Sequence, residues 1–356
     1  MTHAAQLLAI GTAAPEAGLT AEESLRLAQK LSPEVDPERL AALHAHSGVS
    51  RRGSVLTDGG ACEDLLATED GKGPSTAARL ARYRDAAVGL AGAASRDALA
   101  AAGIRPEHIT HLVTVSCTGA DSPGLDHDLI EHLGLSPRIS RTHVGFMGCH
   151  GAINGMAVGS AFVSADPDAV AMVVCAEVCS LHYHIGGTWD QQVANAIFAD
   201  GAACAILGQR PGRAAVRAFG SEVFPNTRDL MSWTIGDHGF RMHLSTRVPG
   251  VLRRHVRAWY ETWLAAHNLT LDQISGWAVH PGGKDILEAV RIGLGLPDDA
   301  LAESRAALDA HGNMSSATVL WVIDVLLRAG TSGPIATIAF GPGLTGEAML
   351  LEVPRT

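Results

Sequence analysis

The chain has 356 residues, of which 47% are hydrophobic and 18% charged, so it can bury a large core and is neither disordered nor fibrous in composition. Asp and Glu number 37 against 27 Lys and Arg, which gives a formal net charge of −10. A protein of this sign gains little from the counterion release that drives nucleic-acid binding, so we expect no nucleic-acid partner.

The N-terminal residues predict a strand and not a targeting segment. Residues 7–11, Leu-Leu-Ala-Ile-Gly, have the pattern of a first strand and turn, and the opening Met1-Thr2-His3 lacks the Lys or Arg of a signal peptide. No apolar run reaches the roughly 18 residues of a membrane span. The six cysteines show no small-domain disulfide framework, so free thiols are expected. We therefore predict a cytoplasmic protein with no membrane span.

Helices and strands then alternate along most of the chain. Residues 1–80 have helical periodicity over 21–31 and 37–46 and a glycine-rich stretch over 52–73, typical of an elaborated cap. In chain order we next predict a helix over 86–102, a strand over 111–116, a helix over 124–133, a helix after Cys149 and a strand over 169–175. This alternation predicts a layered α/β fold.

A weak internal repeat relates the two parts of the chain. Residues 111–135 resemble residues 277–296 with a register of 295 − 134 = 161, and Gly148-Cys149 matches Gly312-Asn313 with a register of 312 − 148 = 164. We interpret the chain as two duplicated units packed about a pseudo-twofold axis. Corresponding helix N-termini would then face each other near the centre, where we expect the chemistry.

Cys149 is the candidate nucleophile. It lies among glycines in 144–156, at the predicted start of an apolar helix. A thiol at a helix N-terminus has its thiolate stabilised by the helix dipole and free N–H groups, which predicts a lowered pKa. The alternative is a buried structural cysteine, because free Cys is among the most buried residue types.

Two further side chains complete a candidate catalytic set. His280 follows the predicted strand 276–279, at the strand end where α/β folds keep catalytic groups. Asn313 opens a small-residue helix at the repeat position of Cys149, although it could simply be an N-cap. A thiol, an imidazole and an amide donor can together form an acyl-enzyme and stabilise an oxyanion.

Four segments carry a resemblance to a known family. Gly148-Cys149, 277–283, 312–317 and 340–345 resemble the signature segments of the type III polyketide synthases, the chalcone and stilbene synthase family. The similarity runs from about Leu7 to the C-terminus. Ketoacyl-ACP synthase III enzymes share the triad but lack Phe-Gly-Pro-Gly and the Pro-Gly-Gly after the histidine. A thiolase would have a second cysteine, and a histidine in place of Asn313.

The resemblance implies a thiolase fold of five layers, αβαβα, with two duplicated halves: residues 1–208 carry the nucleophile, and 209–356 carry the histidine and asparagine. It implies that Cys149 takes an acyl group from an acyl-CoA as a thioester. His280 and Asn313 would hold the carbonyl of malonyl-CoA as it loses carbon dioxide, and the enolate would attack the bound acyl chain. A cyclised pyrone, resorcinol or phloroglucinol would leave. The family implies a homodimer, CoA thioesters as substrates, and no metal or organic cofactor.

The resemblance also assigns a substrate pocket and a CoA site. Phe198 matches an aromatic gatekeeper, although ordinary core packing would explain it too, and a second gatekeeper phenylalanine is replaced by the flexible Met242. Bulky His182 and Trp233 would reduce the cavity and favour few extensions. The remaining pocket residues are Cys117, Cys179, Ser315, Gly341, Pro342 and Gly343. For CoA phosphates the matches are Arg51, Arg52 and Lys284, while Ser50 stands where plant enzymes carry Lys.

Three alternative interpretations of the sequence remain open. Cys175, Cys179, His182 and His184 have the ligand types of a zinc site, but residues on or beside one strand do not converge by spacing alone, so we favour a core strand and cavity wall. A ketoacyl-ACP synthase III-like enzyme would make a single condensation. A non-catalytic acyl-CoA-binding scaffold would have no need of a nucleophile.

Overall fold

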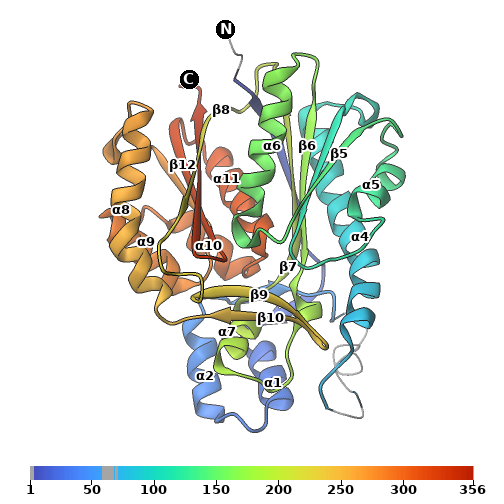
Figure 1. Cartoon of the computed structure of the whole chain (residues 1–356), viewed down its shortest axis with the longest axis vertical. Helices are drawn as coiled ribbons and strands as arrows, with labels where there is room; N and C mark the ends of the chain where they lie inside the picture. The colour runs from blue at the N-terminus through green and yellow to red at the C-terminus, as the bar shows by residue number, and fades with distance from the viewer. Residues whose placement is uncertain (1–3, 58–67, 69–70, 356) are drawn as a thin grey trace.

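The computed structural model describes residues 4–57, 68 and 71–355, and Figure 1 shows the whole chain. The first half contains β1 Gln6–Ala13, α4 Thr76–Ala102, β4 His111–Ser116, α5 Leu125–Leu133, β5 Ser140–Gly145, α6 Gly151–Ala165, β6 Ala171–Val178 and β7 Asp200–Gly208. The second half contains β8 Ala214–Val223, α8 Val248–Ala266, β11 Gly276–Val279, α9 Lys284–Leu294, α10 Ala302–His311, α11 Thr318–Arg328, β12 Gly333–Gly341 and β13 Thr345–Val353.

The main sheet has nine strands in the order β11-β12-β13-β8-β1-β7-β6-β4-β5. β4 is parallel to both β5 and β6, and β11 is parallel to β12, whereas the strands nearer the middle are antiparallel. At the centre, β1 pairs with β8 only through Gln6 with Ala215 and Leu7 with Ala214. This short pairing joins two half-sheets.

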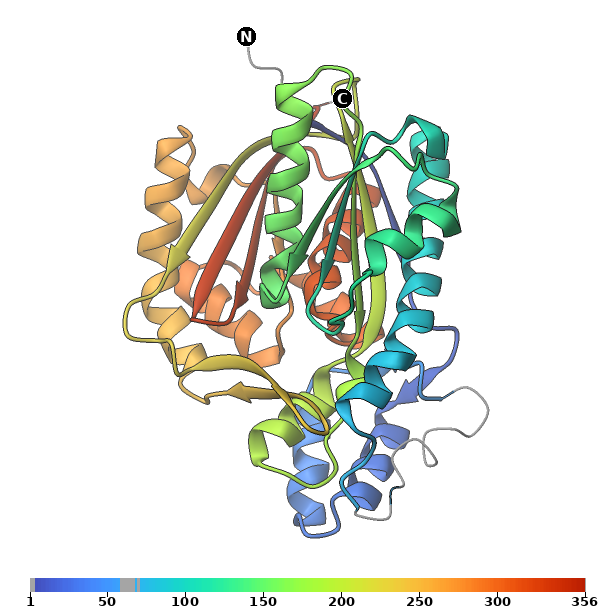
Figure 2. The same ribbon diagram turned by 45° about the vertical axis from the view of Figure 1, so that its right-hand side comes forward.

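Five layers result, as Figure 2 shows. A central core combines α6 and α11 with the inner faces of both half-sheets. α4 and α5 cover the outer face of the first half-sheet, and α8 and α9 cover that of the second. The predicted α/β class and the five-layered thiolase fold are confirmed.

The central helix α6 approaches its sheet closely because of its small residues. A Cβ at Gly155 would lie 2.7 Å from Val115 Cγ2, and a Cβ at Gly159 would lie 2.8 Å from Val173 Cγ2. Glycines four residues apart lie on one helix face, so they form a flat stripe against β4 and β6. The spacing visible in the sequence thus permits the central layer.

A cap closes one end of the layered body, at the bottom of Figure 1. It comprises β2 Gly18–Thr20, α1 Ala21–Leu31, α2 Pro37–His46, β3 Arg51–Gly53, α7 Trp189–Ile197 and the antiparallel hairpin of β9 Met231–Gly236 and β10 Gly239–Leu244. The predicted helices over 21–31 and 37–46 are confirmed. Most of the glycine-rich stretch 52–73 lies outside the described residues.

The structure corrects the register of the repeat at its centre. Short 3-10 turns precede both central helices, Gly148–His150 before α6 and Ser315–Ala317 before α11. Each turn opens with positive φ, +79° at Gly148 and +47° at Ser315. Cys149 is therefore the counterpart of Ser316, and Asn313 lies three residues earlier. The predicted pairing of Cys149 with Asn313 was wrong because it aligned two Gly-X pairs and not the turns.

No helix within the described ranges is both long and apolar enough to cross a bilayer.

Candidate active site

The nucleophile's turn is fixed by a close backbone contact. Gly148 has φ +79°, and a Cβ there would lie 2.3 Å from Cδ of Pro342. Only glycine accepts both the left-handed conformation and the contact. The next residue, Cys149, is 8% exposed and stands at the entrance to α6. The first half thus places the turn that carries the thiol against Pro342, directly after β12 in the second half.

Burial dominates the electrostatics of Cys149. It raises the pKa of the thiol to about 12, although hydrogen bonds from the Ser315 and Asn313 side chains act to lower it. The predicted lowered thiol pKa was wrong for this site, because the loss of water outweighs the helix dipole. Cys149 is therefore a neutral thiol at rest and needs a base to take its proton.

His280 is the side chain predicted to act as that base. It follows β11, its backbone N–H donates to the Ile338 carbonyl at 2.8 Å, and its side chain is buried. Burial, together with the charge of His150, lowers the pKa of His280 to about 3. Neither ring nitrogen has a hydrogen-bond partner among the described residues. The imidazole is thus neutral, with both nitrogens available to a thiol or a substrate.

Asn313 is held as a directed amide donor. Its backbone is hydrogen-bonded on either side of Phe198. The Asn313 N–H donates to the Ile197 carbonyl, and the Ala199 N–H donates to the Asn313 carbonyl, both at 2.9 Å. Its Oδ1 accepts the Ser315 backbone N–H at 2.9 Å. The side-chain oxygen is thereby used, which leaves Nδ2 to donate, and the Asn313 side chain acts to lower the pKa of Cys149.

The predicted pocket residues fall into two adjoining cavities. One contains Cys149, and its walls include Cys117, Cys179, Phe198, Trp233, Met242, Ser315 and Pro342. Cys179, Phe198, Trp233 and Met242 also line the second, as does His182. Gly341 and Gly343 only flank Pro342. Both cavities are small. The volume open to the centre of a water molecule is about 20 Å³ in the first and about 30 Å³ in the second, so each has room for very few waters.

Aromatic packing closes these cavities. His182 stacks on Phe240 at 4.1 Å between ring centroids, and Trp233 meets both rings edge-on. His182 Nε2 lies 2.8 Å from the Thr118 carbonyl, while its Nδ1 accepts the Phe240 backbone N–H. Trp233 donates its indole N–H to the Cys117 carbonyl at 2.9 Å. Because their polar atoms are satisfied, both bulky side chains are held in the cavity wall.

Glu177 is a buried carboxylate that the sequence analysis missed. On β6, it accepts the Cys117 backbone N–H, the Thr118 hydroxyl at 2.7 Å and the Ser316 hydroxyl at 2.5 Å. Burial raises its pKa. It connects the loop after β4 with the 3-10 turn before α11. The sequence feature that could have revealed it is an acidic residue within an otherwise apolar strand.

The three predicted CoA residues are not brought together. Arg51 is exposed and donates to the Glu16 carbonyl at 2.9 Å. Arg52 is 5% exposed and directs its guanidinium at the carbonyls of Asn195 and Phe198 and at the Ser24 hydroxyl, which is the behaviour of a structural arginine. Lys284 is exposed at the start of α9 and lines a separate cavity of about 340 Å³.

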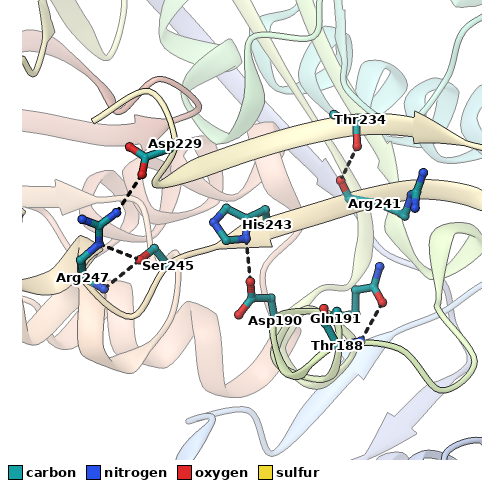
Figure 3. A network of polar contacts seen from close by, with 9 residues as sticks. All are labelled: Thr188, Asp190, Gln191, Asp229, Thr234, Arg241, His243, Ser245 and Arg247. Carbon is teal, nitrogen blue, oxygen red and sulfur yellow. Dashed lines mark hydrogen bonds and ion pairs between the residues drawn. The ribbon is translucent and has the colours of Figure 1, made fainter. Parts of the chain in front are cut away.

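That 340 Å³ cavity is lined by sequence neighbours of Phe198 and Met242. Ile197 lines it, directly before Phe198, and Leu244 lines it two residues after Met242. Figure 3 shows how the hairpin β9–β10 is tied down here. His243 Nδ1 lies 2.7 Å from an Asp190 oxygen of α7, and Arg247 lies 2.8 Å from Asp229.

The zinc alternative finds no support in the geometry. His182 and His184 direct their Nε2 atoms at the carbonyls of Thr118 and Phe240. Over residues 4–57, 68 and 71–355, no three His, Cys, Asp or Glu side chains are grouped so as to hold a metal ion.

Comparison with known proteins decides the family. Residues 2–211 match the model of the chalcone and stilbene synthase N-terminal domain, and residues 216–354 match that of the C-terminal domain. The chain belongs to this family. A 1,3,6,8-tetrahydroxynaphthalene synthase of Streptomyces peucetius is 35% identical, over 90% of this chain and 85% of that protein. An alpha-pyrone synthesis polyketide synthase-like protein of Mycobacterium tuberculosis is 32% identical, over 89% and 83%.

The fold comparison agrees. The crystal structure of a polyketide synthase from the brown alga Ectocarpus siliculosus superposes with a TM-score of 0.94 and 29% identity, covering 99% of each chain. The predicted membership of the type III polyketide synthases, and with it an acyltransferase-type enzyme, is confirmed.

Proposed function

We propose that this polyketide synthase loads an acyl-CoA starter on Cys149 and extends it with malonyl-CoA by decarboxylative Claisen condensation. The observation that carries the proposal is that the Ser315 and Asn313 side chains of the second half both act to lower the pKa of the Cys149 thiol of the first half, and that Ser315 lines the same cavity as Cys149. Asn313 has its oxygen occupied and its N–H groups free, so an oxygen developing negative charge beside Cys149 would meet a donor.

Loading would begin with the neutral thiol. As Cys149 Sγ attacks the thioester carbonyl, its proton passes to His280, and the carbonyl oxygen takes negative charge beside the Asn313 amide. The carbonyl re-forms, the bond to the CoA sulfur breaks, and the CoA thiolate takes the proton from His280. The products are acyl-Cys149, free CoA and a neutral imidazole, so the site is ready for the extender.

Extension would use the same donors. When malonyl-CoA loses carbon dioxide, the electron pair moves onto the thioester oxygen as an enolate, which Asn313 and His280 stabilise by hydrogen bonds in a site with little water. The enolate carbon then attacks the acyl-Cys149 carbonyl, and the Cys149 sulfur leaves as a thiolate that takes a proton from solvent. The chain is now two carbons longer and is carried by CoA. No step needs a metal or an organic cofactor, so we expect full activity in the presence of EDTA.

We propose that the 340 Å³ cavity binds CoA, with Lys284 as the cation that contacts its phosphates. We propose that Arg52 has a structural role instead. Lys284→Ala is expected to raise KM for acyl-CoA with little change in kcat, because an exposed cation contributes to binding equally throughout the reaction. Arg51→Ala is the matched control among the exposed predicted residues. An unchanged KM for Lys284→Ala would contradict this assignment.

We also propose that the small cavity limits extension to short cyclised products of the pyrone, resorcinol or phloroglucinol type. Trp233 and His182 hold the wall, and Met242 is its most adaptable member. Trp233→Ala is expected to lengthen the product, as measured by mass spectrometry of released polyketides. Trp263→Ala, a half-buried tryptophan on α8, is the control. Long polyketides made from a small starter by the unaltered enzyme would contradict the small-cavity proposal.

We propose a homodimer in the cytoplasm. β5 is an edge strand, and after it Phe146 is 50% and Met147 37% exposed, directly before the nucleophile's turn. An exposed edge strand beside apolar side chains is a surface that proteins usually cover. Analytical ultracentrifugation is expected to give twice the chain mass of 37.1 kDa.

The proposed location is supported by the cysteines. The structure contains free thiols at Cys117, Cys149, Cys175, Cys179 and Cys204, which suits a reducing compartment.

The deciding experiment is intact-protein mass spectrometry after incubation with a panel of acyl-CoAs and malonyl-CoA. The unaltered enzyme is expected to gain a starter adduct and release polyketide, whereas Cys149→Ala gains none. Activity only with carrier-protein-bound malonate, and a single condensation, would favour the ketoacyl-ACP synthase III-like alternative. Binding without an adduct would favour the scaffold.

A further inference from the structure

One face of α7 forms a wall of the 340 Å³ cavity. Trp189, Val193 and Ile197 line this cavity, and residues four apart lie on the same face of a helix. Ala194 and Asn195, on another face of α7, line the second cavity of the site. The helix therefore stands between the 340 Å³ cavity and the site, and the 340 Å³ cavity follows it from its first turn to its last residue.

The C-terminal end of α7 is the end nearer to the nucleophile. Phe198 directly follows Ile197 and lines the same cavity as Cys149. A Cβ at Gly283 would lie 4.0 Å from Ile197 Cδ1, so the turn before α9 packs against this end of the helix. Trp189 lies at the other end, eight residues earlier and about 12 Å away along the helix axis. A thioester carbonyl at Cys149 would thus place the rest of its CoA beyond Ile197, in the direction of Trp189.

The indole of Trp189 is held in place by a cation. α2 and α7 lie side by side in the cap (Figure 1), and the guanidinium carbon of Arg39 on α2 lies 3.8 Å from the centroid of the Trp189 ring. Arg39 is exposed and is not one of the described residues that line the cavity, whereas Trp189 is half-buried and lines it. The ring therefore faces the cavity with the surface that Arg39 does not cover.

The charges around the cavity suit an anionic ligand. Asp190 lines it, and one of its carboxylate oxygens lies 2.7 Å from His243 Nδ1 (Figure 3). Asp285 lines it too, with a carboxylate oxygen 2.9 Å from His46 Nε2. Both carboxylates are thus directed at histidine rings, and the exposed ammonium of Lys284 lines the same cavity. A phosphate would meet this cation there.

We propose that Trp189, held from behind by Arg39, stacks against the adenine ring of CoA. The pantetheine arm would run along α7, and the phosphates, which lie between arm and base, would be within reach of Lys284. A nucleobase stacks on an aromatic side chain through its π face, and a ring that is already fixed binds without a further loss of side-chain freedom. This inference rests on the proposed function only in that the ligand is a CoA thioester.

The test is the binding of adenosine 3′,5′-bisphosphate, which has the adenosine and 3′-phosphate of CoA but no pantetheine arm, measured by isothermal titration calorimetry. Trp189→Ala is expected to weaken binding by about 5- to 150-fold, the effect of losing one base–aromatic stack. Trp189→Phe keeps an aromatic face and should lose less. Arg39→Gln removes the cation behind the ring and is expected to weaken binding by about threefold.

Trp263→Ala is the matched control, because Trp263 is also half-buried but lies on α8 and is not one of the described residues that line the cavity. Its affinity should equal that of the unaltered protein. An unchanged affinity in Trp189→Ala, or no measurable binding by the unaltered protein, would overturn the proposal. Bound nucleotide that CoA itself cannot displace would also overturn it, since the nucleotide would then occupy a separate site.

A second measurement covers the case in which Trp189→Ala does not fold. A purine stacked on an indole quenches its fluorescence, so the nucleotide is expected to quench part of the emission of the six tryptophans in a saturable way. This quenching should be absent from the conservative variant Trp189→Phe. Equal quenching in both proteins would contradict the stacking.

Steady-state kinetics separate the base from the arm. Trp189→Ala should raise KM for an acyl-CoA by a comparable factor and leave kcat unchanged, because the base is remote from the reacting atoms. KM for the corresponding acyl-pantetheine, which has no nucleotide, should not change, and equal increases for both thioesters would overturn the proposal. Nucleotide binding needs no reaction, so Trp189-dependent binding without any adduct on Cys149 would count against the proposed function alone.

Discussion

In the proposed reaction Asn313 acts only through its Nδ2 amide group, because its Oδ1 is already bonded to the Ser315 N–H. Asn313→Ala is expected to slow malonyl-CoA decarboxylation by about 10² to 10³-fold, the usual effect of removing one oxyanion donor. Asn313→Asp keeps the shape and the bond to Ser315 but has no N–H to donate, so it should be at least as slow. Decarboxylation assayed as carbon dioxide release would contradict the donor role if Asn313→Asp kept its rate.

Asp200 makes stability depend on pH. It is fully buried, accepts the Ser180 and Val55 backbone N–H groups at 2.7 and 2.8 Å, and burial raises its pKa to about 6. The folded state therefore holds a proton that the unfolded chain releases between about pH 4 and 6, so ionisation of Asp200 lowers stability as pH rises through that window.

The comparison is with Asp200→Asn, which cannot ionise. The free energy of unfolding of Asp200→Asn minus that of the unaltered protein is expected to increase by about 3 kcal/mol between pH 4 and pH 7. Urea unfolding at the two pH values measures this difference. A constant difference would show that Asp200 has the same pKa in both states.

At the level of elements, α7 and β10 position the two residues predicted to form the gate, since α7 leads into Phe198 and β10 contains Met242. The Asp190–His243 pair joins these elements, with side chains 26% and 50% exposed. Asp190→Asn is expected to cost less than about 1 kcal/mol in stability, because exposed pairs are weak. It should, however, raise KM for bulky starters, since the gate loses a cross-link.

Arg247→Gln, which breaks the neighbouring exposed pair with Asp229, is the control and should leave KM unchanged (Figure 3). Steady-state kinetics with a short and a long starter distinguish the two variants. Equal effects would mean that the Asp190–His243 pair has no special role at the gate.

Elements set by local pattern were predictable, and elements set by distant contacts were not. The strand 111–116 is a run of apolar and β-branched residues bounded by turns, and β4 has the same limits. The helix predicted from residue 86 begins at Thr76, because Ser75 caps it and the buried Arg79 bonds to the carbonyls of Leu181 and Tyr183. Those carbonyls are about a hundred residues away, so no local window reveals them.

The same distinction holds within the site. Cys149, His280 and Asn313 stand at ends of predicted elements, where glycines mark the turns, and so were visible in the sequence. Phe240 and Glu177 lie inside strands, and their roles depend on partners from other elements, such as Ser316 on the far half. The pKa of Cys149 was also mispredicted, because burial is a property of the assembled layers and not of the helix start.

For the whole molecule, the shared central core predicts one cooperative unfolding transition. α6 and α11 pack together with strands of both half-sheets, so neither half can bury its inner face alone. Calorimetry at several protein concentrations is expected to show one peak, with calorimetric and van't Hoff enthalpies in agreement per cooperative unit. Two separated peaks would show that residues 1–208 and 209–356 fold independently.

The paired 3-10 turns have a consequence for how such a site can arise. If two identical chains formed a dimer about a twofold axis, the residues before their central helices would have to be identical. When both units are fused into one chain, each unit can mutate independently, so these residues can differ. Here the turn before α6 contains the Cys149 thiol, while the turn before α11 contains Ser316, whose hydroxyl donates a hydrogen bond to Glu177. The asymmetry needed for one thiol to react beside a different set of donors is thus available to a duplicated gene, but not to a symmetric pair of separate chains.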